Sequence, residues 1–164
     1  DSNAILLYLA EKTGKFLSAD TPPARGQLLS WLMFVATGIG PYSGQAVHFK
    51  HFAPEKVPYA NTRYQYEAER HYRVLDERLA GRDFIAAGTY TIVDMAAWGW
   101  ARMVPFILGD DAWTRFPNLK RHLDAVSARQ AAQRVEALRT KFGPAFKAEL
   151  DDEARAHMFK HLAA

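Results

Sequence analysis

The chain has 164 residues, of which 49% are hydrophobic, 24% charged and 13% aromatic, and it contains no cysteine. This length suits one domain with a real core, and the apolar content excludes a disordered or low-complexity chain. Without cysteine there is no disulfide scaffold, thiolate nucleophile or cysteine zinc site. The formal charge of +3 is mild and its basic residues are scattered, which argues against a nucleic-acid partner.

The apolar runs of the sequence are short. The densest, residues 4–10 and 28–36, fall far below the roughly 18 residues that a membrane helix needs. No signal segment stands at the start. We therefore expect a soluble, cytoplasmic protein without a membrane partner.

Helical signals begin with the first residues. Ser2 is a plausible N-cap, apolar residues follow it at helical spacing, and Gly14 provides a C-terminal stop. A helix of about 11 residues is marginal alone and must pack against something. Because the chain opens directly on this helix, we expect a fragment whose upstream residues are missing.

Two helices are predicted next. Thr21 caps the first, which is strongly apolar and ends or kinks at residues 38–41, and residues 42–58 are expected to be irregular. Pro58 opens a long amphipathic helix that Gly81 ends. Its apolar stripe comprises Tyr64, Ala68, His71 or Tyr72, Leu75 and Leu79, and its charged face comprises Arg63, Glu67, Arg70, Arg73 and Glu77.

The second half also reads as helical. Thr91 and Asp94 have the spacing of a capping box, and we assign both to folding. Further helices begin near Phe116 and continue, after a break near Ser127, with a charged tail that ends in a frayed helix. No segment alternates with period two, so the sequence predicts an all-α fold of roughly five to seven helices.

Three segments together resemble the glutathione transferase family. Asp-Ser-Asn-Ala-Ile-Leu-Leu-Tyr-Leu-Ala at residues 1–10 resembles the start of the last helix of its thioredoxin-like domain. Residues 91–94 resemble the capping box of the central helix of its α-helical domain. Residues 116–119 and 128–131 resemble a late stretch of that domain, although Gln130 replaces a usual proline and His122 a frequent tryptophan. Three more stretches look most like the bacterial Nu class: residues 38–45, 53–59 and 63–65.

The resemblance implies a domain plan. Residues 1–17 would be the last helix of an otherwise missing thioredoxin-like domain, and residues 18–23 would be a linker. Residues 24–142 would form the C-terminal helical domain of the transferase bundle, and residues 143–164 a tail. In the family the residue that activates the glutathione thiol lies upstream of this chain, so we expect an active parent and an inactive fragment.

The resemblance also implies binding residues for glutathione as the cosubstrate. Ser2 would hold the γ-glutamyl carboxylate through its hydroxyl and the free N–H groups at the positive end of the helix. Asp1 would pair with the α-ammonium group. Arg70 would reach the glutathione of the partner subunit in a homodimer. The alternatives are that Ser2 is only a helix cap and that Arg70 is a surface residue beside Glu67.

Aromatic and histidine residues give weaker signals. Trp31, Phe34 and Tyr42 are candidates to line a hydrophobic cosubstrate pocket, although aromatic residues at helical spacing are more often core. Two histidine groups have metal-ligand spacing, but their ligand sets are incomplete, so no metal is expected. These groups are His48 with His51, and Glu153 with His157 and His161.

Three functions remain open at this point. The first is a glutathione transferase whose parent activates the glutathione thiol for conjugation to small electrophiles or for reduction of disulfides or peroxides. The second is a stand-alone helical interaction module, with the apolar first helix as its docking surface. The third is a decayed product without activity, which composition does not separate from the first.

Overall fold

The computed structural model describes residues 1–18, 21–143 and 151–162. It divides into two compact units, Asp1–Ser127 and Ala128–Ala164. Both are built from helices, and no strand occurs in these described ranges, so the all-α prediction is confirmed. Parts of the predicted linker (19–20) and tail (144–150 and 163–164) lie outside the described residues.

The helices of the first unit follow one another closely. They are α1 (Ser2–Thr13), α2 (Pro22–Phe34), the π-helix η1 (Val35–Ile39), α3 (Gly40–Val47), the π-helix η2 (His48–Phe52), α4 (Pro58–Leu79), α5 (Ile92–Ala101), α6 (Val104–Leu108), α7 (Ala112–Arg115) and α8 (Pro117–Ser127). The second unit contains α9 (Gln130–Phe142), α10 (Asp152–Met158) and the 3-10 helix η4 (Lys160–Leu162).

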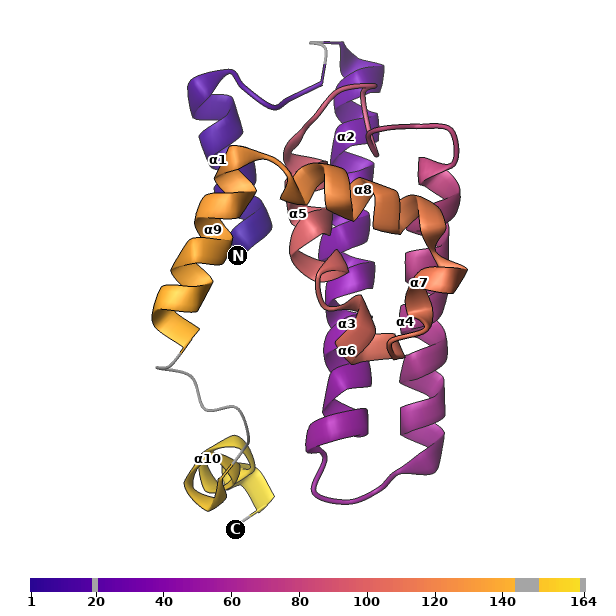
Figure 1. Ribbon diagram of the computed structural model, residues 1–164, viewed down its shortest axis with the longest axis vertical. Helices are drawn as coiled ribbons and strands as arrows, with labels where there is room; N and C mark the ends of the chain where they lie inside the picture. The colour runs from indigo at the N-terminus through magenta and orange to yellow at the C-terminus, as the bar shows by residue number, and fades with distance from the viewer. Residues whose placement is uncertain (19–20, 144–150, 163–164) are drawn as a thin grey trace. The chain divides into compact units, whose positions relative to one another are not determined.

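In the first unit, α2, η1 and α3 form one continuous column beside the long helix α4 (Figure 1). Helix α5 lies at the centre and packs against α1, α2 and α8. Helix α8 also crosses α4, and α6 packs against α3 and α4. The largest fully buried side chains of this core are Tyr72, Phe116, Leu28, Leu32, Ile39, Leu75, Leu79, Ile85, Ile92, Ile107, Leu119 and His122.

The amphipathic pattern of α4 is largely confirmed. The predicted stripe is buried except for Tyr64, which is half-buried. Glu67 was expected on the charged face, and that expectation is wrong: the residue is only 5% exposed. It precedes Ala68 of the stripe, and the side chains of Arg63 and Arg70 fold back onto its carboxylate.

The expectation of irregular chain over residues 42–58 is also wrong. The column stays helical as far as Phe52, and only residues 53–57 separate it from α4. The helix does not break at Gly38–Pro41. It widens there into the π-helix η1, in which the N–H of Gly40 donates to the carbonyl of Val35, five residues back. The glycine and proline therefore change the helix type without ending it.

The ends of α1 and the start of α2 follow the predicted chemistry with one correction, and α4 ends at Leu79, two residues before the predicted Gly81. Asp1, not Ser2, is the N-cap of α1: its carboxylate oxygen accepts from the N–H groups of Asn3 at 2.8 Å and Ala4 at 3.2 Å. Asp and Ser are both good caps, and here the chain enters the helix one residue earlier. Gly14 ends α1 with φ of 63°, and Thr21 caps α2, as predicted.

Candidate functional site

The first turn of α1 carries Ser2 at an exposed position. Asp1 accepts from the N–H groups of Asn3 and Ala4, so fewer free donors remain there than the sequence suggested. The hydroxyl and the N–H of Ser2 have no partner within residues 1–18, 21–143 and 151–162. Both donors stand at the positive end of α1, where a carboxylate is favoured.

A cavity of about 510 Å³ opens beside Ser2, between α1 and α5. Its walls are mostly apolar: Ser2, Asn3, Ile5 and Leu6 come from α1, and Met95, Ala96, Trp98, Gly99, Trp100 and Met103 come from α5 and the turn after it. Trp98 is fixed by donating its indole N–H to Ser127 Oγ at 2.9 Å. None of the α5 residues that line this cavity was predicted as a site residue, although Trp98 and Trp100 lie two positions apart in the sequence.

The three predicted cosubstrate residues lie elsewhere. Trp31 and Phe34 pack edge to face, and Phe34 and Tyr42 both stack on the buried ring of His71, with ring centroids 5.4 and 4.7 Å away. None of the three lines the cavity beside Ser2. The structure therefore brings these aromatic residues together with one another, between the α2–α3 column and α4, and not with Ser2.

Arg70 is held on the surface of α4 by a buried carboxylate. Its Nε donates to Glu67 Oε2 at 2.9 Å, and its Nη2 lies 3.4 Å from Nε2 of His71. The hydrogen bond from Arg70 lowers the pKa of Glu67. Desolvation acts in the opposite direction, and the contact with Arg63 lowers the pKa further. The side chain of Arg70 is 47% exposed, which leaves guanidinium donors for an anion in solvent.

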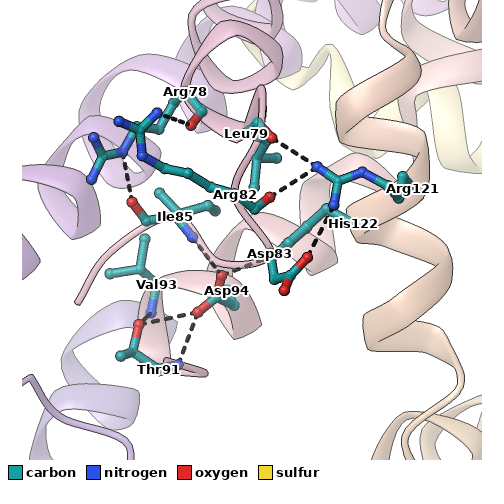
Figure 2. A network of polar contacts seen from close by, with 10 residues as sticks. All are labelled: Arg78, Leu79, Arg82, Asp83, Ile85, Thr91, Val93, Asp94, Arg121 and His122. Atoms are coloured by element: carbon teal, nitrogen blue, oxygen red, sulfur yellow. Dashed lines mark hydrogen bonds and ion pairs between the residues drawn. The ribbon is translucent and has the colours of Figure 1, made fainter. Parts of the chain in front are cut away.

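Thr91 and Asp94 form the predicted capping box at the start of α5 (Figure 2). Asp94 accepts from the N–H of Thr91 at 2.8 Å and of Ile85 at 3.0 Å, and from Nε2 of His122 at 2.9 Å. All of these groups are buried. A buried carboxylate that accepts these three hydrogen bonds stabilises the fold and is not accessible to a reactant.

No group of three or more histidine, aspartate or glutamate residues in the part of the chain that the structure describes could hold a metal ion. His51 instead donates to the carbonyl of Phe106 at 2.9 Å and stacks on its ring. No helix within those residues is long and apolar enough to cross a membrane.

Comparison with known proteins agrees with this architecture. The sequence profile of the glutathione S-transferase C-terminal domain matches residues 58–125. The disulfide-bond oxidoreductase YfcG of Escherichia coli K12 is 40% identical over an alignment of 160 residues that covers 93% of this chain and 66% of YfcG. Glutathione S-transferase 2 of Schizosaccharomyces pombe is 33% identical over 95% of this chain and 68% of its own length. The chain belongs to the glutathione S-transferase family.

A solved structure from this family has a similar fold. A family member from Pseudomonas fluorescens Pf-5, crystallised with two glutathione bound, superposes with a TM-score of 0.75 at 38% identity. The match covers 82% of this chain and 61% of that one. The chain thus spans about two thirds of the length of these relatives.

Proposed function

We propose that this chain supplies the helical part of a glutathione-dependent enzyme and is a fragment of a longer, Nu-class-like protein. One observation carries the proposal: the unoccupied hydroxyl and N–H of Ser2 stand at the positive end of α1. The γ-glutamyl carboxylate of glutathione, the proposed cosubstrate, would bind there. Asp1 uses one oxygen as the helix cap, which leaves its other oxygen for the α-ammonium group.

The proposed reaction uses the glutathione thiolate as the nucleophile toward a small electrophile, a disulfide or a peroxide. YfcG, the relative of 40% identity, is a disulfide-bond oxidoreductase, which favours disulfide reduction. The residue that lowers the thiol pKa lies in the part of the enzyme that this chain does not contain, so the isolated chain is inactive. Trp31, Phe34 and Tyr42 stay candidates for the cosubstrate side of the site.

We further propose that the parent enzyme is a cytoplasmic homodimer that binds neither nucleic acid nor membranes. Helices α2 and α4 expose apolar side chains suited to a second subunit, with Met33 45% and Tyr66 63% exposed. Arg70, exposed on α4, would reach the glutathione of the partner subunit.

A second candidate function rests on the exposed face of α1. Ile5, Tyr8 and Leu9 are 58%, 60% and 48% exposed, which is unusual for large apolar residues on so short a helix. Such a face suits a protein partner, as expected of a stand-alone interaction module. The same face would suit the remainder of a longer enzyme, so turnover must separate the two functions.

The two functions are separated by a chimera. The part of YfcG that this chain does not cover would be joined to residues 1–164, and glutathione-dependent reduction of a small disulfide would be measured for the chimera and for the chain alone. We expect turnover from the chimera and none from the chain. A folded chimera without turnover would favour the interaction module, and turnover by the chain alone would contradict the predicted inactivity.

A further inference from the structure

A second, smaller cavity lies at the C-terminal end of α4, away from the residues discussed for glutathione. It has a volume of about 280 Å³ and is lined by Gln27, Arg78, Arg82, Asp83, Phe84, Ala87 and Gly88. Polar groups therefore come from α2, from α4 and from the loop before α5. This combination differs from the apolar cavity beside Ser2.

The charge in this cavity is unbalanced. The guanidinium groups of Arg78 and Arg82 lie next to one another (Figure 2), and neither forms an ion pair with any carboxylate in the described ranges. The acidic residue of the lining, Asp83, is engaged by Arg121 at 3.2 Å. Burial, and then the charge of Arg82, lower the pKa of Arg78. Two like charges held together without a counter-ion favour an anion between them.

Both arginine side chains are held in place by the fold. Nε of Arg78 donates to the carbonyl of Ile85 at 2.8 Å, and its guanidinium carbon lies 5.3 Å from the ring centroid of Trp31. Nη1 of Arg82 donates to the carbonyl of Arg78 at 3.2 Å. These contacts use one N–H group of each guanidinium, so the remaining donors of both can serve a ligand.

The loop that closes the cavity is strained. Ala87 has φ of 60°, a value that non-glycine residues rarely adopt, and Gly88 follows with φ of 64°. Backbone strain of this kind is concentrated at ligand clamps and other functional sites. The strained turn and the unbalanced arginine pair are independent observations at the same cavity.

We propose that Arg78, Arg82, Gln27 and the turn at Gly88 bind the phosphate monoester group of a small molecule. The two positive charges match a dianion, and guanidinium groups bind phosphate oxygens through paired N–H donors. The half-buried ring of Phe84 offers an apolar wall to the organic part of the ester. This site is independent of the proposed glutathione chemistry.

The test uses the full chain in chloride buffer at constant ionic strength. Inorganic phosphate and phenyl phosphate are titrated while the Nε–H signals of Arg78 and Arg82 and the amide signal of Gly88 are followed by NMR. We expect saturable shifts at these groups, with a Kd of about 1 mM or tighter and tighter binding of phenyl phosphate. Arg82→Gln should weaken binding about tenfold, whereas Arg73→Gln, at an exposed arginine of the same helix, should not.

Three results would overturn the proposal. The first is the lack of saturable shifts at Arg78, Arg82 and Gly88 in the unmodified chain, a measurement that does not depend on the folding of any variant. The second is an unchanged affinity in a folded Arg82→Gln protein. The third is weaker binding of phenyl phosphate than of inorganic phosphate, which would remove the monoester assignment.

Discussion

Asp94 organises the start of the central helix through buried hydrogen bonds. Its carboxylate accepts from two backbone N–H groups and from the ring of His122, all buried. The sequence predicted the bond within the capping box, because that bond depends only on local spacing. It did not predict the contact with His122, a residue that departs from the family pattern. The ring N–H donates to Asp94, which is a role that an indole N–H could also fill.

The first prediction concerns this carboxylate. Asp94→Ala should lower the free energy of unfolding by about 3–5 kcal/mol, because it leaves buried donors without an acceptor. Asp124→Ala is the matched control: Asp124 is exposed and forms an ion pair with Lys120, so its loss should cost less than about 1 kcal/mol. Urea unfolding of both variants measures the difference, and equal losses would contradict the assignment.

Glu67 gives the molecule a specific acid sensitivity. The hydrogen bond from Arg70, with the contribution of Arg63, lowers its pKa below the ordinary value of 4.5. Because the pKa is lower in the folded state, the stabilisation is complete above the ordinary value. It is lost as the pH falls below about 4.5, through the folded value.

The second prediction follows from that sign. Between pH 5 and pH 3, roughly the range in which carboxylates titrate, wild-type stability should fall more steeply than that of Glu67→Gln. Glu77→Gln, at an exposed position of the same helix, should keep the wild-type slope. Urea unfolding at several pH values gives the slopes. Identical slopes for wild type and Glu67→Gln would show that the two arginines do not lower the pKa of Glu67 in the folded state.

At the scale of the elements, caps and periodicity could be predicted and tertiary contacts could not. Gly14, Thr21 and the stripe of α4 were found from the sequence because their signals lie within a turn or two of the chain. For Gly38 the sequence predicts only that the helix ends or kinks nearby. Its real constraint is a neighbour 33 positions along the chain: a Cβ at residue 38 would lie 2.6 Å from Cδ2 of His71.

The third prediction uses two glycines of the same column. Gly38→Ala should lower stability by about 1–3 kcal/mol, because its new methyl group overlaps the stacked ring of His71. Gly44→Ala in α3 meets nothing within 4 Å and should be neutral or stabilising by up to about 1 kcal/mol. Thermal melts followed by circular dichroism compare them. A tolerated Gly38→Ala would mean that His71 is not confined as the structure places it.

For the whole molecule, the family and the all-α architecture could be inferred from the sequence, whereas the site could be inferred only in part. The sequence placed Ser2 at the start of the first helix as its N-cap, whereas Ser2 is the first helical residue and capping by Asp1 removes two of the expected donors. The aromatic candidates Trp31, Phe34 and Tyr42 stack around one another and His71, a long-range arrangement that helical spacing does not contain.

The central claim is that Ser2 holds the glutathione carboxylate, and steady-state kinetics of the YfcG chimera test it most directly. Ser2→Ala should raise the KM for glutathione about tenfold or more with a smaller change in kcat, since a hydrogen bond to a charged group contributes about 1.5–3 kcal/mol. Ser30→Ala, at an exposed serine of α2 that donates to the carbonyl of Gly26 in its own helix, is the control and should leave KM unchanged. An unchanged KM in a folded Ser2→Ala chimera would contradict the claim and leave Ser2 as part of the helix start alone.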